Sequence, residues 1–503
     1  MSFDLNLSLN DLLLMLPELW VTLWICVVLC VNFMMPRVTT KTIALLSVAG
    51  LAVALGCLLW YYHDGVSGVL FKGMFVLDRL ALFFKIFVVG AAVLVTLASI
   101  DFVGRFRFFK AEYYFLVMMA ALGMMFMASA NDLLSVFVTL EFSTFGFYVL
   151  VAYLRDDLRS SEAGLKFFIL GVFAAALLVY GISLVYGETG QLIFPDMVAS
   201  PTPMTTGLAV GWLLIFAAMG FKIGAAPLHS WIPDTYQGAP TPVTAFLSIA
   251  PKGAAFAILL RMFFSTLSSF KPEWVWLMAG MAILSMLYGN IVAIAQRNIK
   301  RMLAYSGIAQ IGTILIGMAA GTRMGADSVL FFLLTYLFAN LGAFAVVIAF
   351  SHASNSDEIE DYSGLNRRSP FLAFSMLIFL FSLAGVPPLA GFIGKLYVFV
   401  AAIQEGLYAL ITIGLISIII SMYYYIIVVK KMYINEPIDP SPIVVPGALK
   451  AVIYIGLAGT FILGVYPQWF MNQVVLATSI FSGLGPTPIV SHFPFGGSSP
   501  HFH

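Results

Sequence analysis

Runs of apolar residues, each close to the length of a membrane span, recur along the whole chain and are separated by short polar segments. An α-helix needs about 20 apolar residues to cross the hydrocarbon core of a bilayer. The pattern therefore predicts an all-α polytopic membrane protein with fourteen transmembrane helices. The polar pair Asn131-Asp132 divides one long apolar stretch into two of them. The helices are expected over residues 11–35, 42–62, 77–100, 111–130, 132–153, 164–187, 206–235, 243–264, 273–296, 300–320, 326–350, 370–400, 406–430 and 448–475.

Composition supports this fold class. Of the 503 residues, 61% are hydrophobic and 10% are charged, whereas a soluble domain carries about 25% charged residues. With a net charge of +1, the chain has no basic field that would attract nucleic acid, and the lipid bilayer is its expected environment. The first apolar run begins at Leu12 without a basic leader and is too long for a signal sequence. We therefore expect it to be retained as a helix.

Basic residues in the connecting segments predict the orientation, because Lys and Arg favour the cytoplasmic side. With the N-terminus outside, the inward-facing loops hold fourteen basic residues and the outward-facing loops hold five. Both termini are therefore expected on the outer side. The inward set is Arg37, Lys41, Arg105, Arg107, Lys110, Arg155, Arg159, Arg297, Lys300, Arg301, Arg367, Arg368, Lys430 and Lys431; the outward set is Lys72, Arg79, Arg261, Lys271 and Arg323.

Residues 220–242, GFKIGAAPLHSWIPDTYQGAPTP, interrupt the apolar pattern with four prolines, a lysine, a histidine and an aspartate. Proline removes a backbone donor and clashes with the preceding turn. The helix over 206–235 is therefore expected to break near Pro227 and again near Pro233. Broken backbone at bilayer depth is tolerated only where protein or a watery cavity satisfies the freed groups. A re-entrant surface loop is the alternative, but ionisable side chains at this depth favour a functional site.

An internal repeat pairs this stretch with a second one. GAAPLHSWIPDTY, which starts at Gly224, has a counterpart in GVPPLAGFIGKLY, which starts at Gly385, and EFSTFGF weakly matches AYSGIAQ. The fourth to eighth and ninth to thirteenth helices then form two inverted five-helix repeats, with breaks in the seventh and twelfth helices. Paired interruptions of this kind indicate an ion or substrate site at the midplane. The expected divisions are 1–110, 111–270, 271–435 and 436–503.

Few ionisable side chains fall deep inside the predicted helices. The deep set is Glu141, Lys222, Lys252 and Lys395. Lys85 and Lys166 lie near helix ends, where a long stem can place the charge at the membrane interface. Glu18 lies early in the first helix, and interfacial anchoring explains it.

The deep lysines and the glutamate suit a proton relay. Burial favours the neutral amine, whereas a nearby carboxylate favours the ammonium ion. A change in the separation of Glu141 and Lys222 would therefore move a proton. The alternative is a static buried ion pair, which is weak evidence for stability and leaves Lys252 and Lys395 unexplained.

His229 lies just after the first break and titrates near neutral pH. We expect it to pass protons between Lys222 and Lys252, with a structural histidine as the alternative. Asp234 is expected to be a helix-end or loop group rather than a member of the relay.

Cysteine and histidine patterns give no support for a bound cofactor. The three cysteines contain no CxxC pair and suggest no disulfide framework. Cys26 and Cys30 share a helix face and are expected to be buried small apolar residues. Only His229 falls well inside an apolar span, so neither bis-histidine haem ligation nor a cysteine-ligated cluster is supported. We expect no cofactor and no metal in this chain.

Several long segments resemble the antiporter-like proton-pumping subunits of respiratory complex I. They are FVTLEFSTFGFYVLVAY, EAGLKFFILG, KIGAAPLHSWIPDTYQGAPTPVTAFLSIAPKGAAFA, NIKRMLAYSGIAQIG and FSLAGVPPLAGFIGKLYVF. The resemblance covers most of the chain from about residue 110 to 435 and is greatest to the subunit N type. The M type would carry a glutamate where Lys395 stands, and the L type would continue past residue 475 into a long lateral helix.

The resemblance implies roles for individual residues. Glu141 matches the glutamate that pairs with Lys222, and Lys166 matches a lysine of the sixth helix. Lys252 matches the connecting lysine, and Lys395 matches the terminal lysine of the twelfth helix. The tail SHFPFGGSSPHFH matches less clearly, and its histidines are expected to belong to a solvated end.

As a whole, the resemblance implies a proton-translocating membrane-arm subunit of an NADH-type or ferredoxin-type quinone oxidoreductase, with no redox catalysis within this chain. Quinone, flavin and Fe–S clusters are expected on partner subunits. The expected partners are M-type and K-type neighbours and the lateral helix of the L-type subunit. The expected location is a bacterial inner membrane with both termini on the periplasmic side, or alternatively a thylakoid-type membrane. An Mrp-type cation/proton antiporter subunit and a structural membrane subunit of a hydrogenase-like complex remain as alternative functions.

Overall fold

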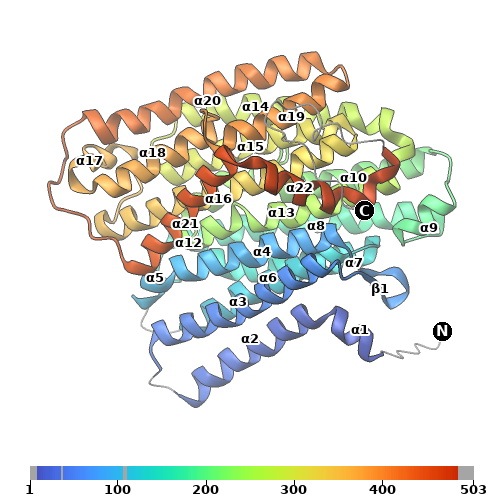
Figure 1. Cartoon of the computed structure of the whole chain (residues 1–503), viewed down its shortest axis with the longest axis horizontal. Helices are drawn as coiled ribbons and strands as arrows, with labels where there is room; N and C mark the ends of the chain where they lie inside the picture. Colours follow the sequence, from blue (N-terminus) through green and yellow to red (C-terminus); the bar gives the residue numbers. More distant parts are fainter. Residues whose placement is uncertain (1–7, 36–37, 106–109, 485–503) are drawn as a thin grey trace, which may run out of the picture.

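Long helices lying side by side make up most of the molecule (Figure 1). The computed structural model describes residues 8–35, 38–105 and 110–484. Within these ranges, thirteen helices are long and apolar enough to cross a membrane. Together with the apolar composition, these helices identify the chain as an integral membrane protein. The tail SHFPFGGSSPHFH lies outside the described residues.

Twenty-two α-helices, five other helical turns and one two-stranded hairpin are present in the described part of the chain. The α-helices are α1 Leu9–Leu14, α2 Leu16–Met34, α3 Thr40–Asp64, α4 Arg79–Ala98, α5 Ile100–Gly104, α6 Lys110–Ser129, α7 Leu133–Val151, α8 Leu158–Thr189, α9 Phe194–Ala199, α10 Thr206–Ile223, α11 Trp231–Gly238, α12 Thr241–Leu247, α13 Ala250–Arg261, α14 Lys271–Ile294, α15 Ile299–Ala320, α16 Arg323–Ser354, α17 Leu365–Arg368, α18 Pro370–Ala384, α19 Ala390–Gln404, α20 Tyr408–Ile434, α21 Gly447–Val465 and α22 Pro467–Ala477. The other elements are β1 Gly68–Leu70, η1 Phe71–Gly73, β2 Phe75–Leu77, η2 Met262–Thr266, η3 Ser268–Phe270, η4 Ile359–Tyr362 and η5 Thr478–Leu484.

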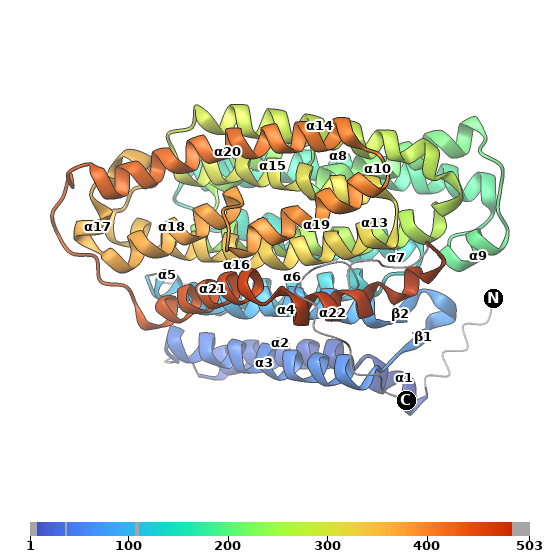
Figure 2. The same ribbon diagram turned by 45° about the horizontal axis from the view of Figure 1, so that its top comes forward.

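The helices form layers (Figure 2). The α2–α3 hairpin makes one edge of the bundle, and α14 and α20 lie at the opposite edge in both views. Between these edges, α15 and α16 are almost completely buried by their neighbours. The last helices, α21 and α22, pack on both α16 and α4. The C-terminal segment therefore joins the N-terminal helices to the centre.

Asparagine and aspartate divide the apolar stretch over 124–153 as predicted. Helix α6 ends at Ser129, and α7 begins after Asp132. The Asp132 carboxylate accepts hydrogen bonds at 2.9 Å from the backbone N–H groups of both Leu134 and Ser135. This N-cap satisfies donors that the first turn of a helix leaves free, so two helices form instead of one.

Two predicted helices are broken in the same way. Helix α10 ends at Gly224 and α18 ends at Gly385, both with positive φ (75° and 94°). At each end, the glycine N–H and the N–H of the following residue return to the same carbonyl of the last turn, that of Gly220 or of Phe381. This Schellman-type ending requires a left-handed residue, which glycine adopts without steric cost.

The expected second break near Pro233 is wrong. Helix α11 begins at Trp231 and runs through Pro233 to Gly238. Proline is tolerated there because the first turn of a helix has no intrahelical acceptor for its N–H groups. The interruption is confined to residues 224–230.

The predicted spans over 243–264 and 448–475 also differ from single helices, and the first of them is divided into α12 and α13. The span over 448–475 is divided into α21 and α22 at Tyr466, where Pro467 begins the second helix. The span over 370–400 consists of the two shorter helices α18 and α19. The count of fourteen spans and the inverted repeat stay predictions.

The prediction that Cys26 and Cys30 are buried is wrong. Both side chains are exposed on α2. Helix α2 packs mainly on α3 and α6 at the edge of the bundle, so one of its faces has no neighbour among the described residues. An apolar face without a protein partner suits contact with lipid.

Candidate functional site

Lys222 and Glu141 meet beside the first helix break. Lys222 lies in the last turn of α10, where the partial negative charge of a helix C-terminus favours a cation. Its Nζ donates a 2.6 Å hydrogen bond to Thr144 Oγ1 and lies 3.8 Å from Glu141 Oε1. Glu141 and Thr144 are three residues apart on α7 and therefore share one face. Both charged side chains are largely buried. The structure thus brings together the pair expected from the sequence.

His229 lies in the break itself. Its imidazole packs against the ring of Tyr288 from α14, with ring centroids 4.4 Å apart. The side chain is buried, and its Nδ1 has no hydrogen-bond partner among the described residues. A buried polar atom without a protein partner usually binds water. His229 thus lies buried in the break beside α14, and no direct bond joins it to either lysine.

Lys252 is buried near the middle of the molecule. It lies in the first turn of α13 and is 1% exposed, and its Nζ has no hydrogen-bond partner in the described part of the chain. The amine lies 5.7 Å from the ring centroid of Tyr236. A Cβ atom added to Gly307 of α15 would lie 3.3 Å from Lys252 Nζ and 3.0 Å from the hydroxyl of Tyr336. Gly307 therefore lets the amine and this hydroxyl approach the same point.

Lys395 caps the end of the other broken helix. Its Nζ donates to the carbonyl oxygens of Leu383 and Ala384, at 2.8 and 3.0 Å. These carbonyls close the last turn of α18, where the helix leaves its acceptors free. Gln310 Nε2 donates to the Leu383 carbonyl as well, at 2.8 Å. The second break therefore holds the buried Lys395 amine by helix-end carbonyls, and no carboxylate of the described residues pairs with it.

Tyr336 and Gln310 complete the site, and sequence reasoning missed both. Together with Lys395 they line a cavity of about 10 Å³, which is close to the volume that one water molecule needs. Tyr336 also borders Lys252 across Gly307. Gln310 could have been found as an amide inside an apolar helix, whereas Tyr336 carries no such signal because tyrosine is common in apolar helices.

Lys166 lies apart from these residues. Its side chain is 46% exposed, and its Nζ pairs with Glu162 at 2.8 Å and Asp234 at 3.0 Å. Asp234 also pairs with Arg301 at 2.7 Å. Asp234 is thus held among surface charges in the first turn of α11. Lys166 belongs to this surface cluster and does not contact Lys222 or Lys252.

The expectation that Lys85 and Glu18 reach the membrane interface is wrong. Both side chains are completely buried and form an ion pair at 2.6 Å between α4 and α2. Removing an ion from water costs several kcal/mol, so two buried charges of opposite sign are favoured as a pair. Their positions near helix ends were misleading because α3, α6 and α13 pack around α4. A second pair, Asp78 with Arg261 at 2.8 Å, lies at the start of α4.

Within the ranges that the structure describes, no group of three or more His, Cys, Asp or Glu side chains is arranged to hold a metal ion.

Comparisons with known proteins identify the family of the chain. The family model described as NADH:quinone oxidoreductase/Mrp antiporter, transmembrane, matches residues 130–421. NADH-quinone oxidoreductase subunit N of Heliobacterium modesticaldum is 45% identical over 84% of this chain and 89% of its own length. A chain of respiratory complex I from Thermus thermophilus superimposes with a TM-score of 0.77 at 31% identity, covering 92% of this chain and 99% of that one.

A chain of the Mrp complex from Dietzia sp. DQ12-45-1b superimposes with a TM-score of 0.85. It covers 94% of this chain and 98% of that one, but only 20% of the residues are identical, so this likeness shows the fold alone. The higher identity to subunit N decides between the two branches of the family. The chain therefore belongs to the NADH:quinone oxidoreductase/Mrp antiporter family, as a membrane-arm subunit of NADH-quinone oxidoreductase of the subunit N type.

Proposed function

We propose that this chain moves protons across the membrane along a row of buried side chains. The row consists of Glu141, Lys222, His229, Lys252 and Lys395, and Lys166 would act from outside it, in the exposed cluster with Glu162 and Asp234. One observation carries the proposal: polar atoms of Glu141, His229, Tyr236 and Lys252 are buried yet lack a hydrogen-bond partner within the described residues. Such atoms require water, and water between titratable groups is what proton transfer needs.

The Glu141–Lys222 pair acts as the switch. At 3.8 Å it is too long for a direct hydrogen bond, and Thr144 holds the lysine instead. Closing the pair to about 2.8 Å would strengthen its attraction by about 1.5 kcal/mol at an effective dielectric constant of about 20. That change corresponds to roughly a tenfold shift in the protonation equilibrium of the lysine. A movement of about 1 Å therefore shifts the balance between the charged and the neutral lysine.

Lys395 forms the other end of the row. The two carbonyls that it contacts lie at the C-terminal end of α18, where a helix stabilises a cation by about 0.3–2 kcal/mol. The lysine can therefore hold a proton without a carboxylate that would trap it. Tyr336, Gln310 and the cavity that they line with Lys395 supply the link back to Lys252.

Electron transfer takes place on other subunits in this proposal. Quinone, flavin and Fe–S clusters belong to partner chains, and the electron donor is NADH or ferredoxin. Quinone reduction there would change the separation of Glu141 and Lys222. The exposed cluster around Lys166 suits contact with a neighbouring membrane subunit, because interfaces are complementary in charge. The proposed neighbours are the M-type and K-type subunits and the lateral helix of the L-type subunit.

Lys222→Met in the complete complex tests the relay. We expect quinone-linked proton pumping into proteoliposomes to fall by about two orders of magnitude, as is typical when a proton-transfer group is lost. Lys271→Met is a matched control, because Lys271 pairs with Glu405 outside the row and should pump normally. Unchanged proton pumping per quinone reduced in Lys222→Met would refute the role of Lys222.

The fold shared with the Mrp complex supports a second candidate function, namely cation/proton antiport. The isolated chain in sodium-loaded vesicles distinguishes the two. Sodium-dependent proton exchange without quinone-linked electron transfer would favour antiport, whereas its absence together with pumping by the complete complex supports the relay.

A further inference from the structure

A polar pocket of about 230 Å³ opens on the face that the basic residues predict to be the inner one. Its titratable lining comes from loops and helix ends in both halves of the chain: Arg105, Asp157, Arg159, Lys300, His352 and Asp357. Its volume has room for several water molecules. The pocket lies outside the row of side chains described above.

Lys300 forms part of the pocket wall. The sequence counts it among loop residues, yet it is only 4% exposed. Its Nζ donates to the carbonyl of Ala239 at 3.0 Å and pairs with Asp357 Oδ2 at 3.3 Å. Ala239 is the C-cap of α11, so its carbonyl lies at the end of a helix that attracts a cation. The ammonium group is therefore shared between a helix end and a carboxylate.

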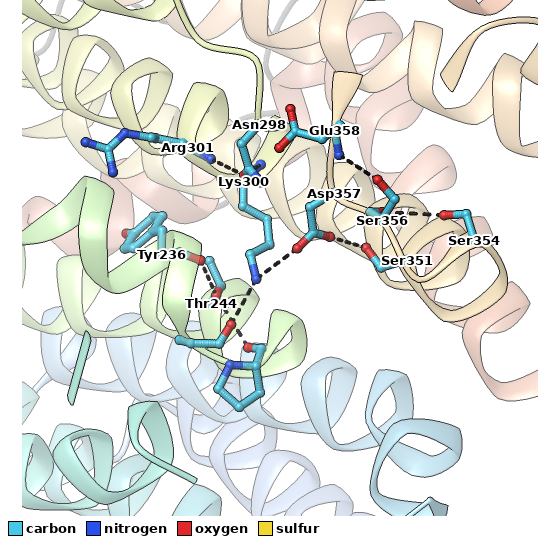
Figure 3. Close-up of polar contacts among 12 residues, drawn as sticks. Tyr236, Thr244, Asn298, Lys300, Arg301, Ser351, Ser354, Ser356, Asp357 and Glu358 are labelled. Carbon is cyan, nitrogen blue, oxygen red and sulfur yellow. Dashed lines mark hydrogen bonds and ion pairs between the residues drawn. The ribbon is translucent and has the colours of Figure 1, made fainter. Parts of the chain in front are cut away.

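The backbone around this pair is fixed from both sides (Figure 3). Asn298 Oδ1 accepts from the backbone N–H of Lys300 at 3.0 Å. The N–H of Ile299 donates to the Asp357 carbonyl at 2.8 Å, and the Ser351 hydroxyl donates to the Asp357 carboxylate. Movement at this point is therefore limited to side chains, above all to the long stem of Lys300.

Thr244 lies next to the backbone that Lys300 contacts, and Tyr236 lies next to Lys252. Figure 3 shows Tyr236 and Thr244 beside the end of the Lys300 side chain. Thr244 Oγ1 donates to the Tyr236 carbonyl at 3.0 Å, and both side chains are completely buried. The ring of Tyr236 lies 5.7 Å from Lys252 Nζ, and its hydroxyl has no partner among the described residues.

We propose that this pocket is the inlet through which solvent protons reach Lys252, and that Lys300 and Asp357 form its gate. In the structure Lys300 donates to the Ala239 carbonyl while it pairs with Asp357, and this is the closed state of the gate. When the ammonium group leaves the Ala239 carbonyl and is held only by the carboxylates of Asp357 and Asp157 in the pocket, water reaches Thr244 and Tyr236. Lys300 is thus a positioning residue, and the inference rests on the relay proposed above.

Substitutions in the complete complex test the gate through the rate of quinone-linked proton uptake into proteoliposomes. Lys300→Met replaces the cation with an apolar stem of similar length, so uptake should fall by about tenfold. Lys300→Arg keeps both interactions and should pump at nearly the normal rate. Lys431→Met is the matched control, because Lys431 pairs with Glu360 on the same face but outside the pocket.

Asp357→Asn gives a second measurement if Lys300→Met does not assemble. Asp357 is partly exposed to the pocket, so the variant should fold, and uptake should again slow because Lys300 stays on Ala239. Two results would overturn the gate. One is proton uptake in Lys300→Met or Asp357→Asn that equals uptake in Lys431→Met. The other is proton uptake in Lys300→Arg that is as slow as in Lys300→Met.

Cysteine labelling tests access without relying on activity. In a complex whose Cys26, Cys30 and Cys57 are replaced by alanine, Thr244→Cys should react slowly with a small thiol reagent added on the inner side. Adding Lys300→Ala, which removes the stem, should speed this labelling by about tenfold, whereas Lys431→Ala should leave it unchanged. Equal labelling rates with and without the Lys300 side chain contradict the gate.

The Lys222→Met complex separates this inference from the function on which it rests. If Lys222→Met pumps normally, the relay itself fails. If Lys222→Met stops pumping while the Lys300 and Asp357 variants behave like Lys431→Met, only the inlet fails.

Discussion

Gly307 is the residue beside which Lys252 and Tyr336 of the proposed relay come close to each other. An alanine methyl group at this position would lie 3.3 Å from Lys252 Nζ and 3.0 Å from the Tyr336 hydroxyl. Both groups would have to move by a few tenths of an ångström. We expect Gly307→Ala to slow quinone-linked proton pumping by about tenfold. Stability should change little. Alanine favours a helix interior over glycine by about 1 kcal/mol, and this gain offsets the cost of moving the two crowded groups. Pumping and the thermal midpoint of the purified complex check the two expectations.

Gly280→Ala provides the control for this substitution. Gly280 also lies inside a helix, α14, and nothing lies within 4 Å of an added Cβ atom there. It gains the same helix propensity without touching the row and should pump normally. Equal pumping in Gly307→Ala and Gly280→Ala would contradict a proton path between Lys252 and Tyr336.

Single residues were predictable where their chemistry contrasts with an apolar helix. Lys222, Lys252 and Lys395 stood out for that reason, and the structure buries all three. Lys85 was misjudged because its burial depends on Glu18, which lies on a helix distant in sequence. Tyr336 was missed because only the packing of α15 against α16 brings it near Lys252.

At the scale of elements, the break between α10 and α11 depends on one backbone conformation. Gly224 has φ +75°, and a Cβ atom there would lie 1.9 Å from Ile232 Cδ1. Gly224→Ala therefore combines a left-handed conformation, which costs about 1–2 kcal/mol, with a clash. Gly190→Ala at the end of α8 has the same backbone cost, with φ +66°, but no atom within 4 Å. We expect both variants to lower the thermal midpoint and Gly224→Ala to lower it more. A smaller decrease of the thermal midpoint in Gly224→Ala than in Gly190→Ala would show that the Ile232 side chain moves aside without an energetic cost.

Proline and glycine predicted the helix breaks, and the position of each proline within its turn explains where the prediction went wrong. Pro227 lies inside the interruption, whereas Pro233 is accommodated in the first turn of α11. The sequence shows which residues are prolines, but where the next helix starts depends on tertiary contacts. Trp231 illustrates this point, because its indole N–H donates to the Phe221 carbonyl across the break at 2.9 Å.

For the whole molecule, the order of the helices followed from the apolar runs, but their lateral arrangement did not. Helices α15 and α16 are central and α2 is peripheral, although all three are similarly apolar. In a membrane, lipid is as apolar as a helix neighbour, so hydropathy alone does not distinguish a buried face from a lipid-facing one. The same ambiguity explains the error over Cys26 and Cys30 in α2.

Orientation is the property of the whole molecule that the proposed inlet needs, because the pocket must face the side from which protons are taken. The excess of Lys and Arg in alternate loops predicts that the loop between α9 and α10 faces outward and the loop between α20 and α21 faces inward. Ser200 lies in the first loop and Val444 in the second, and both are exposed. With Cys26, Cys30 and Cys57 replaced by alanine, a membrane-impermeant maleimide added to intact cells should label Ser200→Cys. It should label Val444→Cys only after the membrane is permeabilised. The opposite result would show that the chain has the reverse orientation, and the pocket around Lys300 would then be an outlet.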